Sequence, residues 1–195
     1  VIAGLAGKAT SDLTLGLGRD MRLTAPAMAA AYRDGMVSEG AMVIDIGQVG
    51  TEMLYFLVGS RGLDGGLMCT ASHNPAAYTG VKLVREGAIA LSGDSGIQEI
   101  RAMIEAGLPA AKETPGSATD LDLYAEFQAA ALGSIDSAAV KPLKVVVDGG
   151  NGMAGAMVGP ILAQLPLRLV ETYWLPDGNF PGHEPNPLLE ENRRF

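Results

Sequence analysis

Thr70-Ala71-Ser72-His73-Asn74-Pro75 is the stretch that decides the fold of this chain. The apolar run Gly66 to Cys69 precedes it and Tyr78 to Val84 follows it, so both flanks are typical of strands. Asn74-Pro75 predicts a turn, because proline fixes its own φ and disfavours a helical conformation in the residue before it. The sequence therefore predicts a tight loop that displays the Ser72 hydroxyl between two strands.

Strand and helix patterns alternate on either side of this loop. Strands are predicted at Leu13–Leu17, Met42–Ile46, Leu67–Cys69 and Val81–Val84. Helices are predicted from Thr24 to Glu39, from Thr51 to Val58, and from Asp94 or Ser95 to Glu105, with the two threonines as caps. This alternation predicts an α/β fold with a mixed, largely parallel sheet and helices on both faces.

A second α/β domain is predicted after a stretch rich in proline, alanine, glycine, serine and threonine, from Leu108 to Thr119. The expected domains are residues 1–117 and 118–195. The expected elements of the second are a helix at Leu121–Leu132, a buried strand at Leu143–Val147, a helix at Met153–Leu165 and a strand at Leu167–Tyr173. One strand-helix-strand unit is too small to close a sheet and a core, so we expect this domain to be incomplete, as in a fragment.

Composition excludes several classes of function. The formal net charge of −8 leaves no basic stripe for a nucleic-acid backbone. No apolar run is long enough to span a membrane, and no signal-peptide pattern with a basic start is present. The one cysteine, Cys69, excludes an intramolecular disulfide and favours a reducing compartment such as the cytoplasm. Its place in a buried strand predicts a small core residue.

A glycine-rich motif in the second domain suggests another function. Gly150-Asn151-Gly152-Met153-Ala154-Gly155 follows a predicted strand and opens a predicted helix, and Glu171 lies about 20 residues further on. This pattern is typical of a dinucleotide site. Asp148 at the end of the strand would repel a pyrophosphate, however, and the same glycines are also typical of close helix-strand packing. A nucleotide-binding module without other chemistry therefore stands as the alternative function.

The residues around Ser72 do not form a hydrolase motif. A free serine hydroxyl is a poor nucleophile without an adjacent base, and a nucleophile elbow has the pattern Gly-x-Ser-x-Gly. Ser72 instead has Ala71 before it and His73 after it. We expect the side chains of these neighbours to diverge, so they do not predict a working Ser-His pair.

The serine loop, with Lys82 ten positions after Ser72, resembles the phosphoserine loop of the α-D-phosphohexomutases, the phosphomannomutase and phosphoglucomutase family. Further segments resemble the same family in the same order: Gly18 to Pro26, Asp45 to Phe56, and Asp177 to Leu188. Together they cover most of the chain. They identify it as the N-terminal portion of a family member, and in that family the glycine-rich motif is a structural turn.

The resemblance implies a reaction and roles for particular residues. Ser72 would carry a phosphoryl group and exchange it with a hexose monophosphate through a bisphosphate, interconverting hexose 6-phosphate and hexose 1-phosphate. Lys82 would act as general acid and base, and His73 would bind the phosphate or the attacking hydroxyl. Arg19, Asp20 and Arg22 are expected either to brace the loop or to form a plain surface ion pair, and His183 is expected to be structural.

The resemblance also implies Mg²⁺, with Ser72 as one ligand and the aspartates of an Asp-Gly-Asp loop as the others. Asp148-Gly149-Gly150 and Asp177-Gly178-Asn179 both lack the later aspartates. We therefore expect the remaining ligands outside this chain and expect the isolated chain to be inactive. A hexose 1,6-bisphosphate is implied as activator and a phosphorylated hexose as substrate. The preference among mannose, glucose and glucosamine stays open, as does the oligomeric state.

Overall fold

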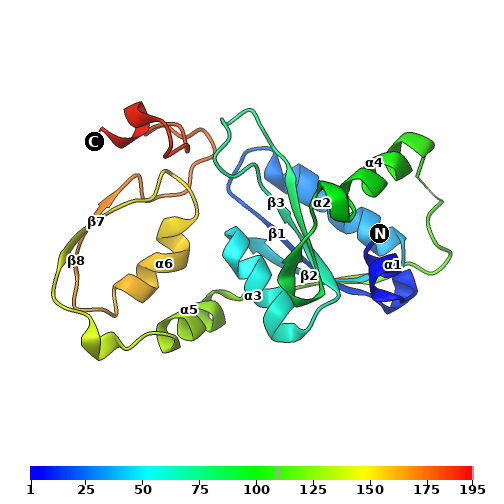
Figure 1. Ribbon diagram of the computed structural model, residues 1–195, viewed down its shortest axis with the longest axis horizontal. Coiled ribbons are helices and arrows are strands. Elements are labelled where there is room, and N and C mark those ends of the chain that lie inside the picture. The colour runs from blue at the N-terminus through cyan, green and yellow to red at the C-terminus, as the bar shows by residue number, and fades with distance from the viewer. Residues whose placement is uncertain (109, 195) are drawn as a thin grey trace.

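The computed structural model describes residues 1–108 and 110–194, which form two α/β units (Figure 1). Pro109 and Phe195, which belong to the predicted linker and second-domain ranges, lie outside the described residues. The larger sheet has the strand order β5-β4-β3-β1-β2-β6. Its strands are β1 (Thr14–Arg19), β2 (Met42–Gln48), β3 (Gly65–Cys69), β4 (Val81–Arg85), β5 (Ile89–Ala90) and β6 (Ser117–Asp120). Strands β1, β2, β3 and β6 pair in parallel, whereas β4 pairs antiparallel with both β3 and β5, which confirms the mixed, largely parallel sheet.

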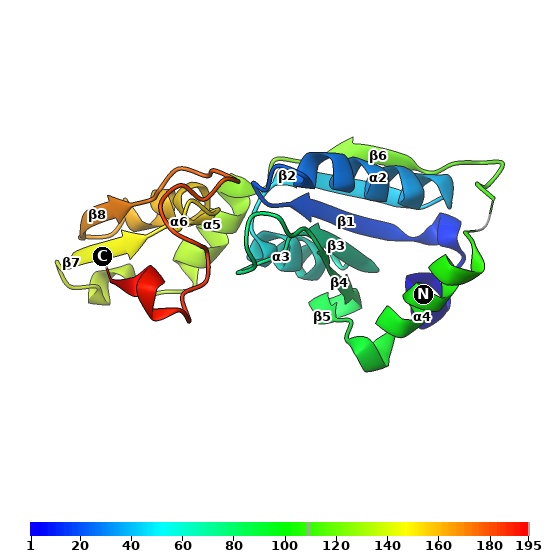
Figure 2. The ribbon, with the colours of Figure 1, turned by 90° about the horizontal axis from the view of Figure 1, so that it is seen from above.

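Helices cover both faces of this sheet, as the alternating pattern predicted. They are α1 (Ile2–Ala6), α2 (Ala25–Ser38), α3 (Thr51–Arg61) and α4 (Ile97–Ala106). Figure 2 shows α2 and α3 on opposite faces. Leu17 packs toward Tyr32 of α2. The neighbouring Gly16 faces α3 so closely that a Cβ there would lie 2.9 Å from Leu57. Successive residues of a strand face opposite sides, so β1 holds both helices against the sheet.

The predicted helix caps differ from the observed ones. Thr24 does precede α2, but its hydroxyl bonds to that of Thr79 in the serine loop rather than to the helix backbone. Gly50, and not Thr51, caps α3. The last predicted helix of this unit begins at Ile97, after a separate turn of 3-10 helix. No helix among the described residues is long and apolar enough to cross a membrane.

The end of the predicted linker is a strand of the first sheet. Strand β6 pairs in parallel with β2, with Ala118 opposite Val43 and Thr119 opposite Ile44. Its residues are small or polar and all are exposed at the sheet edge, so neither a run of apolar residues nor an alternation marks them as a strand. The linker prediction was wrong for these residues, and the predicted boundary between residues 117 and 118 falls inside β6.

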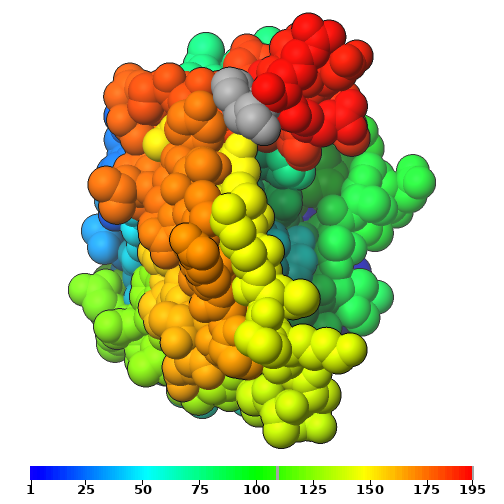
Figure 3. Space-filling model, turned by 90° about the vertical axis from the view of Figure 1, so that its left-hand side faces the viewer, coloured from blue at the N-terminus to red at the C-terminus, as the bar shows by residue number. Residues whose placement is uncertain are grey.

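The second unit contains α5 (Tyr124–Gly133), β7 (Lys144–Asp148), α6 (Ala154–Leu162) and β8 (Arg168–Thr172). Strands β7 and β8 pair in parallel. The prediction that β7 is buried was wrong, because Val146 is 64% exposed. Figure 3 shows β7 (yellow) and β8 (orange) side by side at the surface. Among the described residues, β8 is the only strand that pairs with β7. The apolar residues of β7 therefore lack a second neighbouring strand that would help to cover them.

The two units share a hydrophobic cluster and several polar contacts. Leu123, Met153 and Met157 of the second unit pack in one cluster with the buried side chains of α3. The Gly50 amide lies 3.0 Å from the Met157 sulfur. Arg61 of α3 donates two hydrogen bonds, of 2.9 and 2.6 Å, to the Glu126 carboxylate. These contacts set the ends of β1, β2 and β3 against the turn that follows β7.

An ion pair between Lys8 and Asp64 gives the first unit a pH-dependent contribution to stability. The Asp64 carboxylate accepts hydrogen bonds from Lys8 and from the Thr14 amide. Burial alone would raise the pKa of Asp64, but these two bonds outweigh burial and hold its pKa below the ordinary 3.8. Because the folded-state pKa is lowered, the stabilisation is complete above about pH 4 and is lost as pH falls through the lowered pKa.

We therefore expect Asp64→Asn to flatten the pH dependence of stability below about pH 4. Urea unfolding at several pH values measures the free energy of unfolding for both proteins. Asp34→Asn serves as the control, since the Asp34 side chain is 77% exposed. If the stability of Asp64→Asn falls with acid as steeply as that of the unmodified chain, Asp64 has no such role.

Candidate active site

The serine loop leaves β3 and returns in β4 at the end of the sheet that faces the second unit. Ser72 is exposed and has a left-handed backbone conformation, with φ of 53°. Its amide donates a 2.9 Å hydrogen bond to the Thr70 hydroxyl, which in turn donates at 2.6 Å to Asp20. A buried carboxylate thus anchors the start of the loop, so the Ser72 hydroxyl has a defined position.

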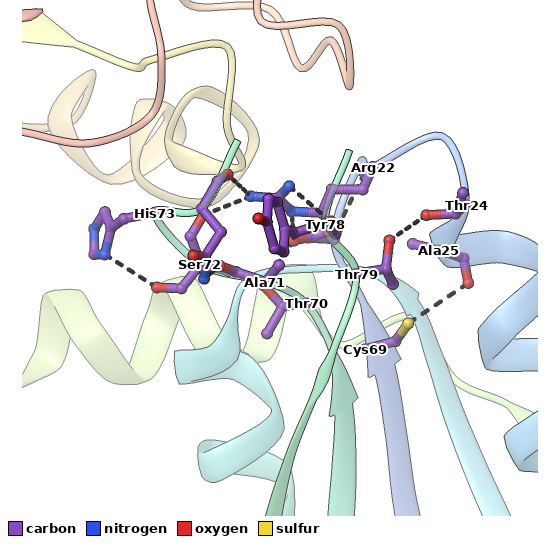
Figure 4. Close-up of polar contacts among 12 residues, drawn as sticks. Arg22, Thr24, Ala25, Cys69, Thr70, Ala71, Ser72, His73, Tyr78 and Thr79 are labelled. Atoms are coloured by element: carbon purple, nitrogen blue, oxygen red, sulfur yellow. Dashed lines mark hydrogen bonds and ion pairs between the residues drawn. The ribbon is translucent and has the colours of Figure 1, made fainter. Parts of the chain in front are cut away.

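Arg22 holds the rest of the loop through its buried side chain (Figure 4). Its guanidinium donates hydrogen bonds of 2.7 to 2.9 Å to four loop carbonyl groups, those of Ser72, Asn74, Pro75 and Tyr78. The Arg22 side chain is fully buried, and its Nε lies 3.4 Å from the Asp20 carboxylate. The contacts match the bracing alternative for these two residues and not a plain surface ion pair.

Arg19 does not belong to this brace. Its guanidinium donates to the Gln48 side chain at 3.1 Å, across the pair β1 and β2. Of the two alternatives expected for Arg19, bracing of the loop is not what its contact shows, and its partner Gln48 is a neutral surface side chain. Arg19 is the last residue of β1 and Arg22 lies in the turn that follows, and this turn carries Arg22 to the loop.

His73 lies beside the Ser72 hydroxyl. The Ser72 Oγ and the His73 Nδ1 share a hydrogen bond of 3.1 Å, drawn as a dashed line in Figure 4. The expectation that these neighbouring side chains diverge was wrong, because it assumed extended backbone, and the left-handed conformation of Ser72 turns the two side chains to the same side. The imidazole is thus placed to exchange a proton with the hydroxyl or to contact a group attached to it.

Lys82 lies on β4, directly opposite Met68 of β3. Its amine donates a hydrogen bond of 3.4 Å to the Thr51 hydroxyl at the start of α3. Both Met68 and Thr51 line the cleft beside Ser72, whereas Lys82 is not among the described residues that line it. The structure therefore brings the lysine to the wall of the site without placing it in the lining.

A cleft of about 570 Å³ separates the two units and contains the serine loop. This volume is in the range of small-molecule sites. From the first unit the lining includes Asp20, Thr51, Thr70, Ser72 and His73. From the second unit it includes Asp148, Gly149, Gly150, Phe180, His183, Pro185 and Arg193. Residues more than a hundred positions apart thus face one space.

His183 is part of this second wall, which the sequence interpretation missed. Its Nε2 donates to the Asp148 carboxylate at 2.9 Å and its Nδ1 donates to the Glu184 carbonyl at 2.7 Å. The Tyr173 ring packs edge-on against it, with 5.0 Å between ring centres. The only sequence signal was the family segment Asp177 to Leu188, which fixes no side-chain role.

The backbone amides at the start of the glycine-rich motif already donate hydrogen bonds within the chain. The amides of residues 149, 150, 151 and 152 donate to Thr172, Asp148, Tyr173 and Gly149 respectively. A Cβ at Gly155 would lie 2.3 Å from the Trp174 carbonyl oxygen. These contacts favour the packing interpretation of the motif over the dinucleotide alternative.

The described residues do not make up a metal site. They contain no group of three histidine, cysteine, aspartate or glutamate side chains that could hold a metal ion. Both oxygens of Asp20, the carboxylate nearest the serine loop, already accept hydrogen bonds from the chain. Among the described residues, Ser72 would therefore be a single ligand. Cys69 is buried beneath the loop, and burial raises its pKa to about 11, which suits an inert core thiol.

Known proteins share this sequence and this architecture. The family model for phosphoglucomutase/phosphomannomutase, alpha/beta/alpha domain I, matches residues 1–110, and that for domain II matches residues 122–194. A phosphomannomutase of Vibrio cholerae is 41% identical over 188 residues, which cover 94% of this chain and 41% of that protein. A Xanthomonas campestris protein described as phosphohexose mutases is 46% identical over 180 residues, which cover 91% of this chain and 40% of that protein.

Solved structures agree. A phosphoglucomutase/phosphomannomutase family protein of Burkholderia thailandensis superposes with a TM-score of 0.81 at 32% identity, covering 98% of this chain and 44% of that one. The chain thus spans about two fifths of the length of the relatives it matches. The family models and these relatives confirm the resemblance, and the chain belongs to the α-D-phosphohexomutase family.

Proposed function

We propose that this chain is the phosphoryl-carrying part of a phosphohexomutase that interconverts hexose 6-phosphate and hexose 1-phosphate. The observation that carries the proposal is the Ser72 hydroxyl, held at the wall of the cleft by the buried Asp20 and Arg22. A family match alone gives no geometry, and a serine loop alone gives no family. Here the family match and the observed geometry both concern Ser72.

In the proposed cycle, Ser72 carries a phosphoryl group at the start. The free hydroxyl oxygen of a hexose monophosphate bonds to that phosphorus, the bond between phosphorus and the Ser72 Oγ breaks, and a hexose bisphosphate forms. The Ser72 Oγ then attacks the phosphorus of the other phosphoryl group of the bisphosphate, and the bond between that phosphorus and the sugar oxygen breaks. This step restores phosphoserine and releases the isomeric monophosphate, so phosphate is neither gained nor lost.

Two side chains would move the protons of this cycle. The attacking sugar hydroxyl must lose its proton, and we assign that task to the amine of Lys82, which lies beside Thr51 at the cleft wall. The Ser72 Oγ must gain a proton when it leaves and lose one when it attacks. The His73 Nδ1, 3.1 Å away, is placed for that exchange or for a contact to the phosphoryl group.

The remaining parts of the proposal rest on the family. Mg²⁺ would neutralise phosphoryl charge, with a Ser72 phosphoryl oxygen as one ligand and the others from outside residues 1–195. A hexose 1,6-bisphosphate would serve as activator, and residues 1–195 alone would not complete the cycle. A reducing compartment such as the cytoplasm is consistent with a buried, unpaired Cys69. The relatives are described as phosphomannomutases and phosphohexose mutases, so the sugar preference stays open.

The test is the location of the phosphate. We expect the full-length protein that contains this chain to gain one phosphoryl group, on Ser72, when incubated with a hexose 1,6-bisphosphate. Intact mass and peptide mapping before and after incubation measure it. Ser72→Ala should gain none, whereas Ser60→Ala, which changes an exposed serine of α3, should gain as much as the unmodified protein. Phosphate on another residue, or none at all, would overturn the proposal.

A further inference from the structure

Phe180 of the second unit covers the guanidinium that holds the serine loop. The Arg22 Cζ lies 5.1 Å from the centre of the Phe180 ring, and Phe180 is 8% exposed. The Arg22 Nε makes no hydrogen bond within the described part of the chain. The ring face, which carries negative charge density, therefore lies over a buried cation with unmet hydrogen-bonding capacity.

The backbone around Phe180 is fitted to this contact. A Cβ at Gly178 would lie 2.7 Å from the Met21 carbonyl oxygen and 2.9 Å from the Leu23 amide, so only glycine allows the turn to approach so closely. Phe180 itself has a left-handed conformation, with φ of 51°, which bulky residues rarely adopt. The turn is closed by a hydrogen bond from the Phe180 amide to the Asp177 carbonyl. A strained aromatic residue is thus held against the segment that precedes α2.

We propose that Phe180 is a positioning residue for Ser72, which acts through Arg22. The ring shields the charged guanidinium from water and favours the orientation in which it points to the loop. The four loop carbonyl groups therefore keep their hydrogen bonds to Arg22. The geometry of the serine loop thereby depends on the docking of the second unit. The effect on phosphoryl transfer rests on the proposed function, whereas the effect on the loop does not.

Amide hydrogen exchange on the chain of residues 1–195 tests the loop directly. The amides of Ser72, Asn74 and Tyr78 each donate a hydrogen bond within the loop, so their exchange reports its order. In Phe180→Leu, which keeps an apolar side chain but removes the ring, we expect these amides to exchange about ten to thirty times faster. Amides of β1 should not change. Phe180→Trp, which keeps an aromatic face, should exchange as the unmodified chain does. Leu188→Ala, an exposed residue of the same unit, is the matched control.

Phosphorylation of Ser72 by a hexose 1,6-bisphosphate in the full-length protein is the second arm. Its rate should fall in Phe180→Leu and recover in Phe180→Trp. If the unmodified protein is not phosphorylated, the proposed function fails while the exchange experiment still decides this inference. Equal exchange of the loop amides in Phe180→Leu and the unmodified chain overturns the inference. If Phe180→Leu does not fold, a nuclear Overhauser contact between the Arg22 side chain and the Phe180 ring in the unmodified chain decides, and its absence overturns the inference.

Discussion

Under the proposed function, Lys82→Met is expected to lower kcat of the full-length protein that contains this chain by about 10²–10⁴, the usual contribution of general acid-base catalysis. Methionine keeps much of the packing of the lysine stem but removes the amine that lies 3.4 Å from the Thr51 hydroxyl. Slow phosphorylation of Ser72 by added bisphosphate should remain detectable, because the serine loop is unchanged. Steady-state kinetics with kcat and KM both resolved measure the effect.

The same variant separates two other roles of Lys82. A lysine that only attracts the anionic substrate would raise KM and leave kcat near normal, and a solvated strand lysine would change neither. Lys144→Met, at an exposed lysine on β7, is the control and should resemble the unmodified protein. An unchanged kcat in Lys82→Met would refute the acid-base role.

Arg22→Met is expected to lower the free energy of unfolding of the chain by about 3–5 kcal/mol, since removing one partner of a buried ion pair leaves a buried charge. The uncompensated charge is Asp20, which is 7% exposed and would keep only its bonds to Thr70 and to the backbone of residue 22. Four loop carbonyl groups would lose their donor at the same time. Urea unfolding followed by circular dichroism measures the loss.

Two variants make this result specific to the position. Arg19→Met removes an arginine from the same strand end, whose partner Gln48 is on the surface, and should cost about 1 kcal/mol or less. Arg22→Lys should not restore stability, because an ammonium lacks the planar fork that reaches several carbonyl groups at once. A loss below about 1 kcal/mol in Arg22→Met would show that the loop does not depend on this guanidinium.

The sequence predicted what depends on local pattern. The alternation of apolar strands and capped helices was enough for the mixed sheet, and the neighbourhood of Asn74-Pro75 was enough for the serine loop. The predictions that failed concern features that depend on contacts with residues distant in the sequence. Strand β6 is a strand because β2 lies beside it, and Val146 is exposed because no described strand but β8 flanks β7. The residues of β6 and β7 alone do not indicate which strands lie beside them.

In the site too, local pattern identified some residues, whereas the positions of others depend on the fold. Ser72 was recognisable from its loop, but the sequence cannot say which of Arg19 and Arg22 turns inward, because that depends on the backbone path after β1. The hydrogen bond between Ser72 and His73 depends on a single left-handed φ. His183 and Phe180 reach the cleft only because the second unit folds back over the first, which no local pattern specifies.

The short passage between the two units limits how the cleft can move. Strand β6 ends at Asp120 and α5 begins at Tyr124, so residues 121–123 alone connect them, with a reach of about 10 Å. The Leu121 amide is bonded to Asp45, and Leu123 is fully buried. This short connection therefore keeps the second unit beside the first. The two walls of the cleft beside Ser72 are thus joined by three residues of backbone, and the cleft cannot be emptied by full separation of the two units.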